Sequence, residues 1–364
     1  MRFPENAEMQ LVLMHMHHQT ANIIFFYITV SDSKTIHKEV SSMKQIDVVT
    51  MGETMVLFTG NESLPIPYVH QFKKQIGGAE SNVAIGLARL GYKSGWMSKL
   101  GDDPFGTYIH HFIRGEGVDT TQVQLIDYAP TGIFFKESLS PEDVRVHYYR
   151  YQSAASTLTK EDVKEEYIKQ ARVLHLTGIT PALSSTCKEA VFQAISYAQK
   201  HSVPIIFDPN IRYKLWNNLD DAKKTLLEMA THSDIILAGE DEGEFLTGEK
   251  DVHSMAKALK TADSQHIIVK QGKSGAYILS NEEMFVEGFP VDQVVDPVGA
   301  GDGFAVGVIS AYLDGQTIPY GVKRGNAIGS LVVKVNGDIE GLPTKRSLEQ
   351  YLSNQSNPGQ DVKR

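Results

Sequence analysis

A glycine-rich turn that ends in an aspartate, Gly299-Ala300-Gly301-Asp302, is the part of this 364-residue sequence best suited to chemistry. The apolar run behind it, Phe304 to Leu313, repeats at helical spacing and is apolar almost all round, which predicts a buried helix. The first N–H groups of a helix lack internal partners and carry partial positive charge, and glycines let an anion approach them. A carboxylate beside such a cradle suits phosphoryl transfer: the amides hold the phosphoryl group while Asp302 takes a hydroxyl proton.

The same turn also fits a simple helix start in which Asp302 only caps the helix. Two other phosphate-binding motifs fail on spacing. A dinucleotide fingerprint requires glycine at its sixth position, where this sequence has Phe304. A Walker A loop requires glycine five residues before Gly272-Lys273-Ser274, where it has Ile267. Phosphoryl transfer and simple capping therefore remain.

Composition restricts the class of protein. Hydrophobic residues make up 41%, enough for the core of one large α/β domain with a small appendage. The net charge of −9 and the lack of a basic tract argue against nucleic acid or an anionic membrane as a partner. Cys187 is the only cysteine, so no intrachain disulfide can form and a reducing, cytoplasmic location is expected. No uninterrupted run of about 18 apolar residues predicts a membrane-spanning helix.

Residues 1–42 differ from the rest of the chain. They hold 4 of the 13 histidines and follow no clean period, whereas ordered patterning begins at Met43. The tripeptide Lys38-Glu39-Val40 is compatible with codons that resemble a ribosome-binding site just before Met43. We therefore expect Met43 to be the native start and residues 1–42 to be a non-native or disordered extension.

From Ile46 onward, short apolar strands alternate with amphipathic helices. Strands are predicted at 46–51, 93–100, 173–179, 203–208, 235–238 and 266–270, and helices at 105–117, 185–201, 220–230 and 252–260. This order predicts an α/β fold with a mostly parallel central sheet and helices on both faces. Ligands would bind at the carboxyl ends of the strands, where Asp208 to Arg212, Gly239 to Glu242 and Gly299 to Asp302 lie.

Two segments alternate with a period of two, 131–137 and 144–150, which predicts half-exposed antiparallel strands. Tyr148 and Tyr149 then face opposite sides. With 54–75, these segments are expected to form a small sheet that belongs to the main domain of 43–352. Residues 294–295 are predicted as a short strand before the glycine-rich turn, and 353–364 as a disordered tail.

The run D-P-V-G-A-G-D-G-F-A-V-G, which contains Asp302, resembles the C-terminal signature of the ribokinase-like (PfkB) carbohydrate kinases. The resemblance implies that Asp302 is the catalytic base and that Gly299, Ala300 and Gly301 form the anion hole. The run from Gly78 to Asn82 resembles the family's sugar-binding signature. The family also implies a ribokinase-like fold whose small sheet forms a lid over the sugar and expels water.

Two arginines favour a sugar acid as the phosphoryl acceptor, because the planar guanidinium of Arg150 or Arg212 can bind a carboxylate through two parallel hydrogen bonds. Each arginine alone also fits an ordinary surface ion pair. Together with further runs, they resemble the 2-keto-3-deoxygluconate kinases. The matching runs are G-G-A-E-S-N-V-A, Y-Y-R followed by S-A-A-S, T-G-I-T-P-A-L-S and D-P-N-I-R-x-x-L-W.

The resemblance implies phosphorylation of the 6-hydroxyl of 2-keto-3-deoxygluconate. The residues implied to contact the sugar acid are Gly78, Ala79, Glu80, Ser81, Asn82, Phe134, Tyr148, Tyr149, Arg150, Arg212, Asp302 and Asp338. Phe134 stands where some relatives carry tyrosine. A neutral ketose such as fructose is the alternative acceptor, and a catalytically silent sugar or nucleotide sensor is the alternative from another class.

On the nucleotide side, Gly239 to Glu242 stands in place of the family's N-x-x-E, with glycine instead of asparagine. Glu242 would keep the acidic role toward Mg²⁺ through water, or would simply begin a helix. The residues implied to bind ATP are Asn210, Arg212, Gly239, Glu242, Lys270, Gly272, Gly275, Gly299, Gly301 and Asn326. Mg²⁺ is expected with ATP. Some relatives need K⁺, which the residues leave open, and the exposed lid suggests self-association into a homo-oligomer.

Overall fold

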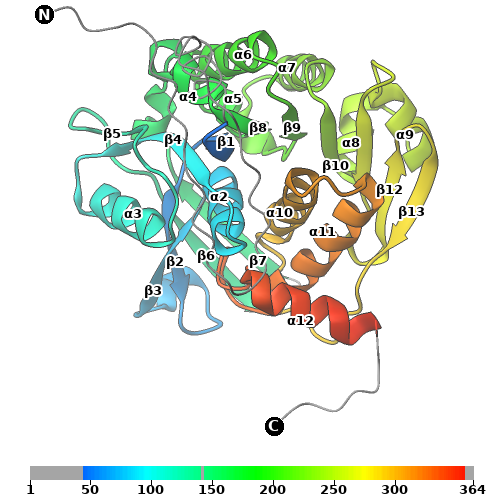
Figure 1. Ribbon diagram of the computed structural model, residues 1–364. Helices are drawn as coiled ribbons and strands as arrows, with labels where there is room; N and C mark the ends of the chain where they lie inside the picture. Colours follow the sequence, from blue (N-terminus) through cyan, green and yellow to red (C-terminus); the bar gives the residue numbers. More distant parts are fainter. Residues whose placement is uncertain (1–43, 141–142, 357–364) are drawn as a thin grey trace, which may run out of the picture. The chain divides into compact units, whose positions relative to one another are not determined.

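The computed structural model describes residues 44–140 and 143–356 (Figure 1). The expectations for residues 1–42 and for most of the C-terminal tail lie outside the described residues. None of the helices in these two ranges has the length and apolar character needed to span a membrane.

A nine-stranded sheet forms the centre of the domain. In spatial order its strands are β13 (Glu283–Glu287), β12 (Gly275–Leu279), β11 (His266–Lys270), β10 (Ile235–Gly239), β9 (Ile205–Asp208), β8 (Ala171–Thr177), β1 (Ile46–Met51), β4 (Ser94–Gly101) and β5 (Val123–Ile126). All neighbours from β11 to β5 pair in parallel, and only β12 and β13 add antiparallel pairs. The predicted mostly parallel sheet is thus confirmed.

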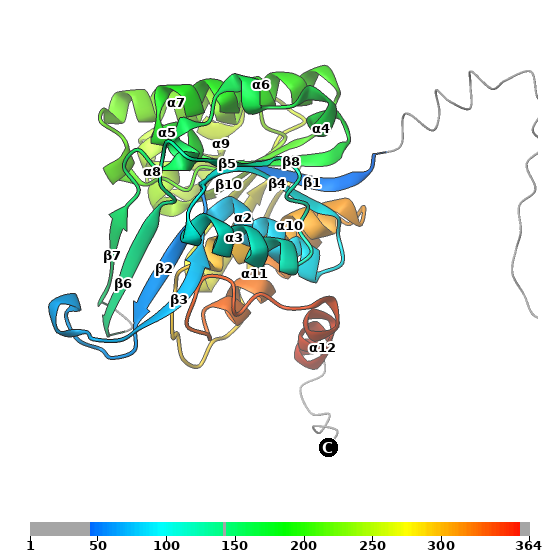
Figure 2. The same cartoon turned by 90° about the vertical axis from the view of Figure 1, so that its left-hand side faces the viewer.

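Helices cover both faces of this sheet, which Figure 2 shows edge-on. One face carries α4 (Glu165–Lys169), α5 (Thr180–Leu183), α6 (Ser185–Lys200), α7 (Leu219–Thr231), α8 (Glu240–Thr247) and α9 (Val252–Leu259). The other carries α2 (Ala79–Arg89), α3 (Pro104–Gly115), α10 (Ala300–Leu313), α11 (Ile318–Val332) and α12 (Lys345–Ser356). Because β-strands between two helical layers bury both sides, the central strands are largely apolar, as in I-I-L-A of β10.

A second, four-stranded sheet, here called the lid sheet, has the order β3 (Phe72–Gly77), β2 (Met55–Gly60), β6 (Ile133–Ser140) and β7 (Asp143–Tyr149). Its strands project beyond the central sheet in Figure 2. Phe134 lies opposite Tyr148 in the β6–β7 pair. Since side chains alternate along each strand, Phe134, Val146 and Tyr148 share the face that turns toward α10 and α2.

Helix α10 is buried on all sides, as its apolar sequence predicts. Every residue from Asp302 to Leu313 is buried except Tyr312. Two expectations are wrong. Residues 294–295 form no strand, because this segment crosses from β13 to α10 with Val294 and Val295 about 40% exposed and only one bond, from Val295 N to Val333 O at 2.8 Å. Helix α12 continues to Ser356, past the expected start of the tail at residue 353.

Candidate active site

A cavity of about 610 Å³ lies between the carboxyl ends of the central strands and the lid sheet. Asp302, in the first turn of α10, reaches this cavity and is 9% exposed. The turn before it is tight. Gly299 has φ +84°, and a Cβ there would stand 2.5 Å from the backbone oxygen of Asp338, so only glycine fits. The N-terminal end of α10, with Gly299 and Gly301, thus opens directly onto the cavity.

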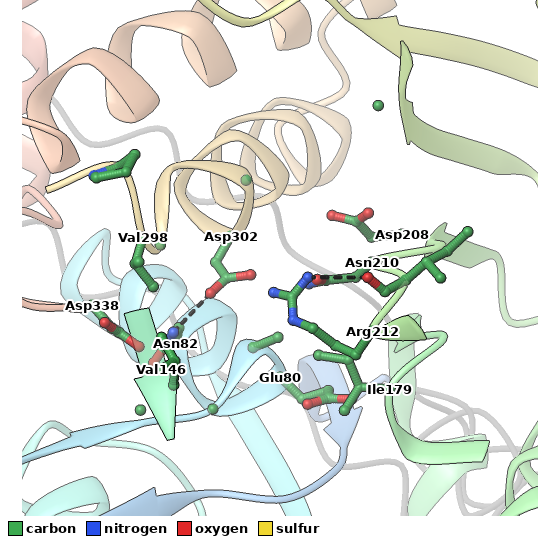
Figure 3. A pocket seen from close by; sticks show the side chains of 18 of the residues that line it. Glu80, Asn82, Val146, Ile179, Asp208, Asn210, Arg212, Val298, Asp302 and Asp338 are labelled. Carbon is green, nitrogen blue, oxygen red and sulfur yellow. Dashed lines mark hydrogen bonds between the residues drawn. The ribbon is translucent and has the colours of Figure 1, made fainter. Parts of the chain in front are cut away.

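Asp302 is electrostatically perturbed. Its pKa is raised to about 7, chiefly by burial and also by the nearby Asp208 and Asp338 carboxylates, while Asn82 and Arg212 oppose the shift. Nδ2 of Asn82 donates a 2.7 Å hydrogen bond to Oδ2 of Asp302 (Figure 3). A carboxylate with a pKa near neutrality is matched to accepting a proton at physiological pH.

Most of the residues implied by the sequence line this one cavity. They are Gly78, Ala79, Glu80, Asn82, Phe134, Tyr148, Arg150, Asn210, Arg212, Gly239, Glu242, Lys270, Gly272, Gly299, Gly301, Asp302 and Asp338. Segments from across the chain therefore converge on a single space, in which Figure 3 shows the side chains of Asp302 and Arg212 close together.

Five of the implied residues are not among the lining residues of the cavity. Tyr149 lies on the opposite face of β7 from Tyr148 and is 65% exposed, contrary to the expectation that it contacts the substrate. Its ring instead packs edge-on against Phe135. The period of two in a strand, which the sequence itself shows, gives the reason.

The other four residues form hydrogen bonds with backbone atoms or closely approach them: Ser81, Ala300, Asn326 and Gly275. The hydroxyl of Ser81 donates to Gly78 O at 3.0 Å. The amide of Ala300 reaches Pro297 O at 3.5 Å. Asn326, expected near the adenine, donates to Val286 O and Glu287 O and so ties α11 to β13. Gly275 begins β12 with φ +125°, where a Cβ would stand 2.1 Å from Val286 O.

Arg150 is already paired with a carboxylate that sequence reasoning missed. Its Nε lies 2.7 Å and its Nη2 2.5 Å from Oε2 of Glu53, and both side chains are buried. Oε1 of Glu53 accepts from the hydroxyl of Ser153. Glu53 thus orients the guanidinium, while Nη1 of Arg150 has no partner among the described residues. Glu53 follows β1 directly, so the rule that ligands bind at strand ends could have found it.

Three further ion pairs, made by two lysines, were also missed. Nζ of Lys270 lies 3.0 Å from both carboxylate oxygens of Asp208, which ends β9 and lines the cavity. Burial alone would lower the pKa of Lys270, but the charges of Asp208, Glu242 and Asp302 raise it, so the ammonium stays charged. Behind the cavity wall, Lys136 pairs with Asp296 and Asp338.

Glu242 begins α8 as the alternative interpretation expected. Its Oε2 accepts from Gly239 N at 2.7 Å and its Oε1 from Ile211 N at 2.9 Å. Within residues 44–140 and 143–356 no three side chains of His, Cys, Asp or Glu are arranged so that they could hold a metal ion between them. Carboxylic side chains nevertheless outnumber cationic ones in the cavity lining, eight to three, so bound phosphates would need added positive charge.

Glu80 has a different environment from the other acids. It is fully buried, and its Oε1 accepts from the hydroxyls of Thr177 at 2.6 Å and Thr180 at 2.8 Å. Its Oε2 has no partner among the described residues. Burial raises the pKa of Glu80 although both threonines oppose this. A carboxyl held in this way favours the neutral, protonated form at the cavity wall.

A helix N-terminus with bare glycines and a buried aspartate of raised pKa, in a cavity beside the lid sheet, fit a phosphotransferase of the sugar-kinase class. A family model described as pfkB family carbohydrate kinase matches residues 45–345. The chain therefore belongs to the pfkB family of carbohydrate kinases, as its sequence signatures predict.

The most similar relatives carry sugar-acid names. The 2-dehydro-3-deoxygluconokinase of Bacillus subtilis (strain 168) is 45% identical over 313 residues, which cover 85% of this chain and 97% of the relative. The 5-dehydro-2-deoxygluconokinase of the same organism is 33% identical over 319 residues, covering 86% and 98%. Among solved structures, a provisionally named ribokinase II of E. coli in complex with ATP and Mg²⁺ is 26% identical, with a TM-score of 0.78 and coverage of 85% and 99%.

Proposed function

We propose that this chain transfers the γ-phosphoryl group of ATP to the 6-hydroxyl of 2-keto-3-deoxygluconate, giving 2-keto-3-deoxy-6-phosphogluconate and ADP. The observation that carries the proposal is the juxtaposition, in one cavity, of the buried Asp302 at the N-terminus of α10 with two arginines, Arg150 and Arg212. The 45% identity with a 2-dehydro-3-deoxygluconokinase supports the same substrate.

In this proposal Asp302 accepts the proton of the 6-hydroxyl while the hydroxyl oxygen bonds to the γ-phosphorus. At the same time the bond between the γ-phosphorus and the oxygen of ADP breaks. The amides at Gly299, Ala300 and Gly301 stabilise the charge on the transferred group. Lys270 and Arg212 would hold the phosphates of ATP. Mg²⁺, bound through the phosphates and through water at Glu242, would offset the phosphate charge in this acidic cavity.

On the acceptor side, the free Nη1 of Arg150 would bind the substrate carboxylate while Glu53 keeps the guanidinium in place. Arg212 makes no ion pair within the described residues, and its Nη1 reaches only Ile211 O at 3.5 Å. It is thus available to a ligand. A neutral ketose would offer no carboxylate to the free Nη1 of Arg150, which disfavours fructose as the acceptor.

A second sugar acid, 5-dehydro-2-deoxygluconate, is the next candidate, because a relative named for it is 33% identical over nearly its full length. The carboxylate-binding argument applies equally to both acids. The higher sequence identity, 45% against 33%, favours 2-keto-3-deoxygluconate.

A coupled assay of ADP release tests the proposal with 2-keto-3-deoxygluconate, 5-dehydro-2-deoxygluconate and fructose side by side. We expect the highest kcat/KM with 2-keto-3-deoxygluconate, and ³¹P–¹H correlation NMR of the product should locate the phosphate on carbon 6. A higher kcat/KM with fructose would refute the sugar-acid assignment. No turnover with any acceptor, together with binding of ATP or sugar, would instead support the sensor.

A further inference from the structure

A lysine that does not line the cavity connects the lid sheet with the glycine-rich turn. Lys136 lies on β6, two residues from Phe134 and on the same face, and only 1% of its side chain is exposed. Its Nζ lies 2.8 Å from Oδ2 of Asp296 and 2.9 Å from Oδ1 of Asp338. One ammonium group thus joins the lid, the start of the D-P-V-G-A-G-D run, and the loop between α11 and α12.

Both aspartates also contact backbone that shapes the phosphoryl site, Asp296 through its carboxylate and Asp338 through its own backbone. Oδ1 of Asp296 accepts from Val298 N at 3.1 Å, directly before the glycine-rich turn, and its Oδ2 accepts from Gly337 N at 3.1 Å. The backbone of Asp338 packs against Gly299 so closely that a Cβ on this glycine would overlap it. The position of the anion-hole turn therefore depends on these two aspartates.

The two aspartates need a positive charge between them. Asp296 is 3% and Asp338 4% exposed, so neither carboxylate is solvated by bulk water. Without a cation they would repel one another at low dielectric and force the two loops apart. Burial alone would lower the pKa of Lys136, but Asp338 and Asp296 raise it, so that its charge persists at neutral pH. Lys136 supplies one monovalent charge to this arrangement, and a free K⁺ or ammonium ion carries the same charge.

We propose that the ammonium of Lys136 serves as a built-in monovalent cation, which positions the anion-hole turn so that phosphoryl transfer needs no free K⁺. Lys136 is a positioning residue, because it acts through Asp296 and Asp338 and does not line the cavity. The inference rests on the proposed kinase activity but not on the identity of the sugar acid.

The test compares the unmodified chain with Lys136→Met, Lys136→Arg and a matched control, Lys99→Met. Lys99 is also buried, with Nζ 2.6 Å from Oδ2 of Asp162, and does not line the cavity. Initial rates are measured in tetramethylammonium buffer without K⁺ and again with added KCl or NH₄Cl. The acceptor is the sugar that the unmodified chain turns over fastest.

We expect the unmodified chain and Lys136→Arg to have the same kcat with and without K⁺. Lys136→Met should lose about 10²-fold in kcat without K⁺, the cost of slight misplacement at a reacting centre, with a smaller change in the KM for ATP. K⁺ or NH₄⁺ should restore at least part of this loss. Lys99→Met can lower stability but should show no response of kcat to the cation.

Activation of the unmodified chain by K⁺ would overturn the inference, as would a Lys136→Met variant with normal kcat in K⁺-free buffer. A loss in Lys136→Met that neither cation restores would reduce Lys136 to a structural role and overturn it too. If Lys136→Met does not fold, the K⁺ response of the unmodified chain and of Lys136→Arg decides. If no sugar is phosphorylated, the proposed function has failed instead. The inference is then decided by thermal unfolding, in which K⁺ should raise the midpoint of Lys136→Met only.

Discussion

The side-chain amide of Asn82 donates a 2.7 Å hydrogen bond to the carboxylate of Asp302, and so joins the first turn of α2 to the first turn of α10 across 220 residues of sequence. Burial raises the pKa of Asp302 to about 7, and this bond opposes the shift because it favours the charged form. Asn82, which the sequence resemblance assigns to sugar binding, therefore also lowers the pKa of the candidate base.

This bond leads to a prediction about pH. Asp302 can accept a proton only when ionised, so kcat/KM should rise with pH and level off above about 7. Asn82→Ala removes a hydrogen bond to the charged form, worth about 1.5–3 kcal/mol, and should move this rise upward by about one pH unit or more. Rate profiles between pH 5.5 and 9 check this, with Ser81→Ala as control, since Ser81 bonds to Gly78 O instead. An unmoved profile in Asn82→Ala would separate Asn82 from the titration of the base.

Asp302→Asn should separate activity from stability. Turnover should fall by roughly 10²–10⁴-fold, the scale of a general base, while ATP binding measured by calorimetry is kept. A carboxyl whose folded pKa lies above its unfolded pKa favours folding at low pH, and this contribution is lost as pH rises through about 7. At pH 8 the charged Asp302 therefore destabilises the fold, and Asp302→Asn should raise the free energy of unfolding by about 1–4 kcal/mol. Near-normal turnover would remove Asp302 from its proposed role.

The buried Glu53–Arg150 ion pair is best tested by changing both residues in the same variant. Arg150→Ala alone would leave Glu53, 2% exposed, without a counter-charge and could cost about 3–5 kcal/mol of stability. The double variant Glu53→Gln with Arg150→Met removes both charges. It should raise the KM for the sugar acid by about 10–100-fold, the loss of a charge-assisted hydrogen bond, and change the KM for ATP by less than about twofold.

Steady-state kinetics with each substrate varied in turn measure both constants, and Glu53→Gln alone is the control that keeps the guanidinium. Equal changes in the KM values for the sugar acid and for ATP would show that Arg150 does not bind the substrate carboxylate.

Local sequence patterns located the candidate base and the sheet, because each depends on residues close in the chain. The strand–helix alternation predicted the parallel sheet, and the glycine-rich run located Asp302 at a helix start. The period of two in β7 set Tyr148 apart from Tyr149, and applied strictly it would have kept Tyr149 out of the candidate site.

The ion pairs around the cavity could not be predicted in this way. Arg150 and Glu53 are 97 residues apart, and Lys136 is 160 residues from Asp296 and 202 from Asp338. No local period encodes such pairs, since they form only when separate strands and loops meet. Val294 and Val295 show the converse: their types favour a strand, but no neighbouring strand is present to pair with them.

The glycine-rich turn before α10 offers a matched pair of glycine variants. Gly299 has φ +84°, and a Cβ there would meet the backbone of Asp338 at 2.5 Å, whereas a Cβ on Gly301 would have as its nearest neighbour Nζ of Lys270 at 3.9 Å. Gly299→Ala adds a positive-φ penalty to a clash with backbone, and should cost about 2–4 kcal/mol in the free energy of unfolding and displace the turn. Gly301→Ala lies inside α10 and should keep or slightly raise stability, because alanine is the better helix former. Chemical denaturation of both variants measures this difference. Equal stability of the two would mean that the contact between Gly299 and Asp338 does not constrain the turn.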